Sequence, residues 1–156
     1  MAAQGRNDIL HLVYVAAAMI KEGENFVELG SAFPNYLRDH MQAEDNNKFS
    51  ISDEGAHACF YNLCDPETAA QAVSRLRTTS NDCFIPGDHK EPWRSIPSTY
   101  ILCTKDKAIV PELQQFMSKN AQQTITIETD HSPFYSSQNE LLDTLCAVSN
   151  KVKATT

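Results

Sequence analysis

The sequence predicts an α/β fold built on a short parallel sheet. Its last third alternates between two patterns: a strand over Thr99–Cys103, a helix from Pro111, a strand over Thr124–Glu128 and a helix after Ser137. Strands that alternate with helices are joined by right-handed crossovers and therefore form a parallel sheet. The apolar run Ile9–Ala18 suits a further strand that is buried on both faces, although its periodicity also allows a short buried helix.

Length and composition indicate one ordinary globular domain. The chain has 156 residues, of which 42% are hydrophobic and 21% are charged. This balance is typical of a folded protein and excludes collagen-like, disordered and coiled-coil chains. A chain of this length buries enough apolar surface to fold without a metal ion or a disulfide. We therefore expect a single domain over residues 1–156.

A long segment between the first strand and the last third departs from this alternation. It extends from about Asn25 to Pro97 and consists of short helical patterns interrupted by Gly and Pro. We expect a helix over Ser52–Asn62 and a polar connection over Asp39–Lys48. An insertion of this length after a buried strand is typical of a lid, so the segment is interpreted as a helical cap over the sheet.

Three helices have recognisable starts. Asp65 is a candidate N-cap with Pro66 in the first helical position, and Pro111 begins a second helix in the same way. Ser137 and Glu140 form a capping-box pattern before the third. The apolar residues that recur at helical spacing are Ala69, Val73 and Leu76 in the first helix, Leu113, Phe116 and Met117 in the second, and Leu141, Leu142, Leu145 and Val148 in the third.

Charge and hydropathy exclude two classes of partner. Thirteen Lys and Arg against 20 Asp and Glu give a net charge of -7, so a phosphate backbone is repelled and we expect no nucleic acid. The longest apolar run, Leu12–Ile20, is far shorter than the roughly 20 residues that cross a bilayer, so we expect no membrane association.

The beginning of the chain and its cysteines favour a cytoplasmic protein. Met1–Asp8 is polar and lacks the basic and apolar stretches of a signal peptide. The five cysteines are odd in number and include no C-x-x-C pair, so we expect reduced thiols rather than a disulfide framework or a zinc site. No metal and no cofactor are predicted.

Ionisable side chains follow two of the predicted strands. Asp106 lies just after Thr99–Cys103, and His131 lies just after Thr124–Glu128. The carboxyl ends of parallel strands meet at one edge of a sheet, so both side chains should lie at the same rim. An Asp that accepts a hydrogen bond from one imidazole nitrogen leaves the other free as a general base. The alternative is a structural histidine that caps a loop.

Other candidate residues carry weaker signals. Ser132 follows His131 directly, and we do not expect its side chain to face that imidazole. Cys59 and Cys64 lie in the expected cap, where a thiol is most often a small buried side chain. The aromatic residues that are candidates for lining an apolar substrate pocket are Phe60, Tyr61, Trp93 and Phe134, with Tyr135 beside them.

Three segments resemble a known family. PWRSIPSTYILCTKDKAIVPELQQFMSKN and HSPFYSSQNELLDTL are similar to the C-terminal part of α/β-hydrolases of the small-esterase and hydroxynitrile-lyase-like group, particularly its fungal members. LHLVYVAAAMIKEGENF resembles the strand and turn that follow the nucleophile region, and the segments around Phe60 and Trp93 resemble the cap. The resemblance implies a truncated α/β-hydrolase fold of about three parallel strands, with Asp106 as triad acid and His131 as triad base.

The sequence departs from this family in one respect. No Gly-x-Ser-x-Gly or Gly-x-Cys-x-Gly occurs in the chain, so the acid and base of a triad are present without its nucleophile elbow. We therefore expect His131 and Asp106 to perform proton-transfer chemistry of the lyase, isomerase or cyclase type on a small, apolar, carbonyl-bearing metabolite. The alternatives are a non-catalytic pseudo-hydrolase or binding protein, and one half of a two-chain hydrolase.

The resemblance also predicts an assembly. In a complete fold of this family, the strand within Ile9–Ala18 pairs with a strand that this chain does not contain. An apolar strand with a free edge favours association. We expect a homodimer joined through that edge or through the surface that the missing half of the fold would cover.

Overall fold

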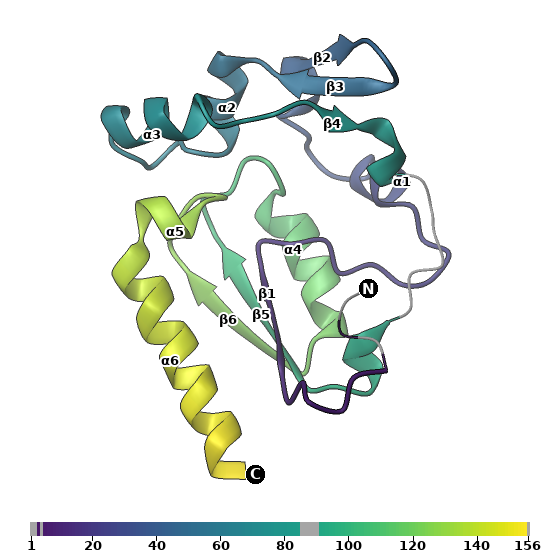
Figure 1. Ribbon diagram of the computed structural model, residues 1–156, viewed down its shortest axis with the longest axis vertical. Helices are drawn as coiled ribbons and strands as arrows, with labels where there is room; N and C mark the ends of the chain where they lie inside the picture. Colours follow the sequence, from purple (N-terminus) through teal and green to yellow (C-terminus); the bar gives the residue numbers. More distant parts are fainter. Residues whose placement is uncertain (1–2, 4, 85–90, 156) are drawn as a thin grey trace.

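The core of the molecule is the predicted parallel sheet. The computed structural model describes residues 3, 5–84 and 91–155. In it, β1 (Leu12–Val15), β5 (Ser98–Cys103) and β6 (Gln123–Ile127) pair in the order β1-β5-β6, and both pairings are parallel (Figure 1). The predicted α/β fold class is confirmed.

The central strand organises the packing on both faces of this sheet. All six residues of β5 are buried, and its side chains alternate between two apolar clusters. Tyr100 and Leu102 pack with Leu113 and Met117 of α4 (Pro111–Met117). Ile101 and Cys103 pack with β6 and with α6 (Gln138–Thr155) on the other face. The result is a three-layer arrangement of helix, sheet and helix.

The first strand is shorter and less buried than its apolar sequence predicts. Only Leu12–Val15 is a strand, and Val13 is 38% exposed although we expected burial on both faces. Leu10, within the predicted strand, precedes β1 and is 55% exposed. The reason is topological: β1 has a hydrogen-bonded neighbour on one side only among the described residues. The expectation of a doubly covered strand is therefore wrong.

The cap is a mixture of helices and strands rather than purely helical. Its helices are α1 (Phe26–Gly30), α2 (Asp53–Cys59) and α3 (Pro66–Val73), with short 3₁₀ turns η1 (Arg38–His40), η2 (Asn81–Phe84) and η3 (Pro92–Arg94). Strands β2 (Met41–Glu44), β3 (Lys48–Ile51) and β4 (Thr79–Ser80) form an antiparallel sheet in that order. Residues 85–90 of the expected cap lie outside the described residues.

The cap hairpin replaces the polar connection expected over Asp39–Lys48. Strands β2 and β3 are joined by Asp45, Asn46 and Asn47, and the two asparagines have φ values of 60° and 58°. Asn adopts this left-handed conformation more readily than most residues, so Asp-Asn-Asn suits a tight turn. Every residue of β2 is exposed, which explains why the segment lacks an apolar pattern.

The helices begin where they are predicted, at Pro66, at Pro111 and directly after Ser137. The capping box differs from the prediction, because Ser137 Oγ donates to the Glu140 carboxylate at 3.0 Å. The Asp65 carboxylate accepts a hydrogen bond from the Thr68 N–H at 3.0 Å, and Ser52 caps α2 through the Gly55 N–H at 3.1 Å. These bonds satisfy donors that the first helical turn would otherwise leave free.

Two apolar residues of the last helices are not in the core. Phe116 of α4 is 42% exposed and Leu142 of α6 is 59% exposed. A short helix, α5 (Pro133–Ser136), precedes α6, and a 3₁₀ turn, η4 (Ser118–Asn120), follows α4. Leu113, Met117 and Val148 are buried as predicted.

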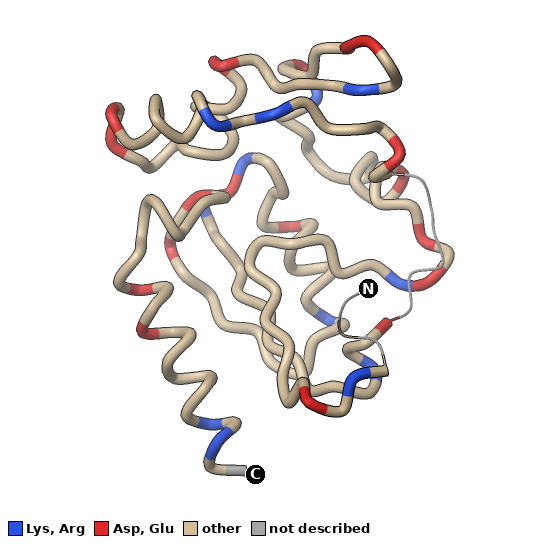
Figure 2. Tube along the Cα trace, viewed as in Figure 1, with Lys and Arg blue, Asp and Glu red and all other residues tan. Residues whose placement is uncertain are grey.

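The cap covers the end of the sheet where the strands finish. In Figure 1, β5 and β6 both point toward α2 and α3, so the loops that follow these strands lie beneath the cap. Figure 2 shows that charged residues of both signs occupy these loops and the cap. In the described part of the chain, no helix has the length and apolarity needed to cross a membrane.

Gly55 offers a test of how the cap is packed. A Cβ atom at this buried position of α2 would lie 2.1 Å from Cβ of His40, an atom too close to the backbone to swing aside. We predict that Gly55→Ala lowers the free energy of unfolding by about 1–3 kcal/mol, measured by urea denaturation. Gly30→Ala is the control, because its Cβ would lie 3.8 Å from Leu113, an ordinary contact. Equal stability of the two variants would contradict this packing.

Candidate functional site

The loops that follow β5 and β6 are joined by backbone hydrogen bonds. The Thr104 N–H donates to the Ile127 carbonyl at 3.0 Å, and the Lys105 N–H donates to the Thr129 carbonyl at 2.9 Å. This pairing extends the parallel ladder past the last strand residues. It brings Asp106 and His131 together, with His131 Nδ1 2.8 Å from Asp106 Oδ2.

Asp106 is buried and receives hydrogen bonds on both carboxylate oxygens. Its Oδ1 accepts from the backbone N–H groups of Ala108 at 2.7 Å and Ile109 at 2.9 Å. Its Oδ2 accepts from Gln114 Nε2 at 2.9 Å as well as facing His131. Only 2% of Asp106 is exposed, so these donors replace the water that an ionised carboxylate requires.

Gln114 is the side chain that sequence reasoning missed. It is fully buried on α4, and its amide also donates to the carbonyls of Ile109 at 2.6 Å and Cys103 at 3.3 Å. Its oxygen accepts from the Cys103 N–H at 3.0 Å. Gln114 therefore ties Asp106 to the end of β5. The signal in the sequence is a polar residue on the apolar face, four positions after Val110 and three before Met117.

His131 presents one nitrogen to Asp106 and leaves the other uncommitted. A carboxylate only accepts hydrogen bonds, so the neutral imidazole carries its proton on Nδ1. Among the described residues, no hydrogen bond engages Nε2, and the side chain is 27% exposed. The ring of Phe60, at the end of α2, lies against the imidazole with centroids 5.4 Å apart. This arrangement suits a general base that is covered by the cap.

The four aromatic candidates for substrate binding do not gather in one pocket. Phe60 contacts His131, and Tyr61 is buried beside it with its ring edge toward Tyr135. Trp93 belongs to a different cluster, where it packs against Tyr14. Phe134 is 53% exposed. Of these four, only Phe60 has a recorded ring contact with His131.

A cavity of about 650 Å³ lies between the cap and the loop that carries Asp106. It is partly open to solvent and has apolar and charged walls, so it differs from an enclosed apolar pocket. Its lining residues are Tyr36, Asp39, His40, Ala58, Cys59, Asn62 and Leu63 from the cap, and Thr104, Lys105, Asp106 and Lys107 from the loop.

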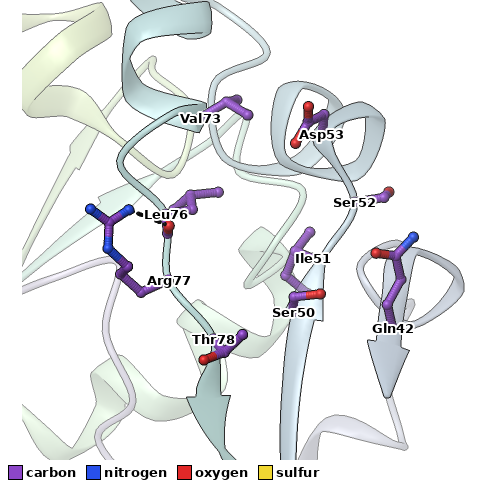
Figure 3. Close-up of a pocket in the computed structure, with 9 residues that line it drawn as sticks. All are labelled: Gln42, Ser50, Ile51, Ser52, Asp53, Val73, Leu76, Arg77 and Thr78. Carbon is purple, nitrogen blue, oxygen red and sulfur yellow. Dashed lines mark hydrogen bonds between the residues drawn. The ribbon is translucent and has the colours of Figure 1, made fainter. Parts of the chain in front are cut away.

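Two further cavities lie away from His131. One of about 300 Å³ is mainly apolar and includes Phe26, Phe84, Trp93 and Ile109. The other, of about 540 Å³, lies within the cap between β3 and the end of α3 (Figure 3). There the Arg77 guanidinium donates to the neighbouring Leu76 carbonyl at 2.9 Å. Neither of these two is lined by Asp106, and His131 is not among the lining residues of any of the three cavities.

The thiols near the site are held in their protonated form. Burial raises the pKa of Cys103 to about 12, with the Asp106 charge adding to the effect. Burial and the nearby Asp130 raise the pKa of Cys64 to about 11. Burial also raises the pKa of Cys59, although Lys107 opposes the shift. A nucleophilic cysteine requires a lowered pKa, so none of these three has the setting of an activated thiol.

Within the described ranges, no cluster of His, Cys, Asp and Glu has the geometry to hold a metal ion. The groups that the site presents are an imidazole, a carboxylate and the hydrogen-bond donors around them.

Comparison with known proteins gives the same family by two routes, a family model and a curated relative. The family model described as "Alpha/beta hydrolase family" matches residues 1–144. The alpha/beta hydrolase nvfD of Aspergillus novofumigatus is 26% identical over an alignment of 134 residues, and the match covers 83% of this chain and 52% of that protein. The chain thus spans about half the length of this curated relative.

Solved structures share the fold at low sequence identity. Polyneuridine aldehyde esterase has a TM-score of 0.75 at 19% identity, covering 90% of this chain and 62% of that chain. A histidine-to-alanine variant of tomato methylketone synthase I, complexed with beta-ketoheptanoate, has a TM-score of 0.70 at 19% identity, covering 92% and 62%.

Alkylation of the five cysteines tests whether the site contains an activated thiol. With iodoacetamide at about pH 8, we predict that exposed Cys83 and Cys146 react first, while Cys59 and Cys103 stay unmodified in the folded protein. A pKa of about 11 leaves only about one Cys64 thiol in a thousand ionised at that pH, so it should react slowly. Peptide mass spectrometry measures each rate. Reaction of Cys59 as fast as that of Cys146 would contradict this account.

Proposed function

Because this chain belongs to the alpha/beta hydrolase family, we propose that it uses His131 as a general base and Asp106 as the orienting acid in a proton-transfer reaction on a small, largely apolar, carbonyl-bearing metabolite. The reaction class is lyase, isomerase or cyclase rather than ester hydrolysis. We further propose that this chemistry takes place in the cytoplasm.

The observation that carries this proposal is the 2.8 Å contact between His131 Nδ1 and Asp106 Oδ2. Asp106 is held in place by Gln114 and two backbone N–H groups, so the imidazole has a fixed partner. This partner selects the tautomer whose Nε2 lone pair is free to accept a proton. It also stabilises the imidazolium that forms when a proton is taken up.

The non-hydrolytic class is supported by the lack of a nucleophile in this chain. It contains no Gly-x-Ser-x-Gly motif, and its thiols near Asp106 are held protonated by burial. Hydrolysis through an acyl-enzyme requires an activated nucleophile and an oxyanion hole. Abstraction of a proton α to a carbonyl requires only a positioned base and a group that stabilises the enolate.

The substrate class is supported by the cavity beside Asp106. Its volume of about 650 Å³ is in the range of small-molecule sites. Side chains such as Tyr36, Ala58 and Leu63 offer apolar contact, while Lys107 offers positive charge to a carbonyl or enolate oxygen. The Lys105 ammonium also lines the cavity but pairs with Glu128 at 3.2 Å. A methylketone synthase of the same fold was crystallised with beta-ketoheptanoate, which is an oxo acid.

In the proposed step, His131 Nε2 removes a proton from the carbon next to the substrate carbonyl. The electron pair of the broken C–H bond moves into the carbonyl group and forms an enolate, while the proton forms the imidazolium. Asp106 stabilises the imidazolium, which then returns the proton to another atom of the same substrate. No external oxidant or reductant takes part.

Two alternatives stay open. One is a non-catalytic pseudo-hydrolase that binds a small molecule in the cavity without using the dyad. The other is a role as one half of a two-chain hydrolase.

We also propose that the protein is a homodimer joined through the free edge of β1. Leu10 and Val13 are exposed at this edge, and they line a shallow groove of about 300 Å³ together with Leu145 and Val148 of α6. An edge strand with apolar side chains favours pairing with another chain. Two β1 strands in antiparallel pairing would join two sheets into one.

Deuterium exchange at the substrate carbon tests the dyad without knowledge of the product. In D₂O, we predict that the protein accelerates exchange α to the carbonyl in at least one of a panel of small ketones and β-keto acids. His131→Ala should reduce the accelerated rate by about 10²-fold or more, because the base is lost. Asp106→Asn should also slow it, because an amide does not stabilise the imidazolium. Proton NMR measures the exchange.

His57→Ala is the matched control for this experiment. His57 is an exposed imidazole on α2 that takes no part in the proposed site, and the variant should exchange at the rate of the unmodified protein. Binding of a panel member without accelerated exchange favours the pseudo-hydrolase. Retained exchange in His131→Ala shows that the dyad is not used.

Light scattering tests the dimer. We predict a mass of twice 17.4 kDa at micromolar concentration, and a shift toward the monomer in Val13→Lys, because a charge on the edge opposes pairing. Val27→Lys, which places a charge at another exposed position in the cap, should leave the mass unchanged. A monodisperse monomer would overturn the dimer.

A further inference from the structure

Asp130, which precedes His131, is a buried carboxylate that the proposed mechanism does not use. None of its surface is exposed. Its Oδ2 accepts from the Leu63 N–H at 2.8 Å, and Cys64 Sγ lies 3.8 Å away. Its Oδ1 accepts from the Ser132 N–H at 3.0 Å and from the Ser136 hydroxyl at 2.6 Å. One oxygen therefore faces the cap, and the other faces the loop that carries His131.

The Ser136 hydroxyl, which donates to Asp130, is also in contact with a second hydroxyl. Ser136 Oγ lies 2.7 Å from Thr129 Oγ1. Since the single Ser136 proton is directed to the carboxylate, the Thr129 hydroxyl donates to Ser136. The chain of hydrogen bonds from Thr129 through Ser136 to Asp130 is buried or half-buried throughout. Hydrogen bonds in such a chain polarise and strengthen one another.

The burial of this carboxylate is not explained by an ion pair. No Lys, Arg or His forms a salt bridge with Asp130 among the described residues, and its partners are neutral N–H, hydroxyl and thiol groups. Charged acceptors form stronger hydrogen bonds than neutral ones, but their burial is costly unless each oxygen is satisfied. Asp130 satisfies both oxygens only when the cap turn and the His131 loop are docked together.

The cap turn that Asp130 holds is the one that covers His131. Leu63 lies three residues after Phe60, whose ring packs on the imidazole. In the same turn, Tyr61 packs on Tyr135, and Asn62 Nδ2 donates to the Lys105 carbonyl at 3.3 Å, next to Asp106. The turn Phe60–Cys64 thus contacts both loops of the dyad, and among the described residues only Asp130 gives it a hydrogen bond to a carboxylate.

We infer that Asp130 is a positioning residue of the proposed site, which docks the cap turn Phe60–Cys64 so that Phe60 is seated on the His131 imidazole. The catalytic consequence of this docking rests on the proposed function. The geometry that it requires can be measured without any substrate.

Asp130→Asn removes the charge at nearly constant volume. With its NH₂ group toward the Leu63 N–H, the amide loses the docking bond; with its oxygen toward Leu63, it keeps the bond but replaces a charged acceptor by a weaker, neutral one. In either orientation the bond to the cap turn is weakened. We expect hydrogen exchange of the Leu63 amide to become about tenfold faster under native conditions. We also expect diethyl pyrocarbonate to modify His131 several-fold faster relative to His57 of the same molecule, because the imidazole loses its cover.

Asp65→Asn is the control variant. Asp65 is an exposed carboxylate in the same region of the cap, and it caps α3 through Thr68. Asn is about as good an N-cap as Asp, so this variant removes a carboxylate charge in the cap and keeps the helix end, without touching Asp130 or His131. The ratio of His131 to His57 modification should stay at the value of the unmodified protein.

The inference is overturned if Asp130→Asn folds and leaves both the Leu63 exchange rate and the His131 to His57 ratio unchanged. If that variant does not fold, Ser136→Ala removes one donor to the same carboxylate, and it must shift both rates in the same direction for the inference to stand. If both rates shift but His131→Ala retains accelerated exchange of the ketone panel, the docking role stands and the proposed function fails.

Discussion

The buried carboxylate of Asp106 needs hydrogen-bond donors in place of water, and the other residues of the site supply them. An ionised group with 2% exposure must receive hydrogen bonds on both oxygens, and they come from three separate segments. Ala108 and Ile109 supply them from its own loop, Gln114 from α4, and His131 from the loop after β6. The parallel pairing of β5 and β6 brings His131 within reach, and the packing of α4 on β5 does the same for Gln114.

The cap shields the His131 imidazole from solvent at the same end of the sheet. His131 stands at the end of the sheet, where the imidazole would otherwise be open to solvent, and Phe60 covers one face of it. The cap turn is fixed by Asp130 and, more weakly, by Asn62. The two buried carboxylates thus have different partners: Asp106 fixes the imidazole from within the sheet layer, and Asp130 fixes the cap that covers it.

Much of this arrangement can be predicted from the sequence, because it depends on chain order. The alternation of strand and helix in the last third predicts the parallel sheet, and the position of Asp106 and His131 just after two strands predicts their proximity. The hairpin at residues 41–51 lacks an apolar alternation because β2 is fully exposed, and only its Asp-Asn-Asn turn marks it. Val13 is exposed because strand order, which no local pattern encodes, leaves β1 at an edge. Gln114 is marked in the sequence as a polar residue on an apolar helix face, but its bond to Asp106, like the contacts of Asp130 with the cap, depends on tertiary structure that a local pattern does not encode.

The tautomer of His131 tests the account most directly. Long-range ¹⁵N–¹H correlation NMR on the neutral imidazole distinguishes a proton on Nδ1 from one on Nε2. The account predicts the Nδ1–H form, hydrogen-bonded to Asp106 and lost in Asp106→Asn, with Nε2 as an unprotonated nitrogen. A neutral ring that carries its proton on Nε2, or that exchanges freely between both forms, would contradict a base oriented by Asp106.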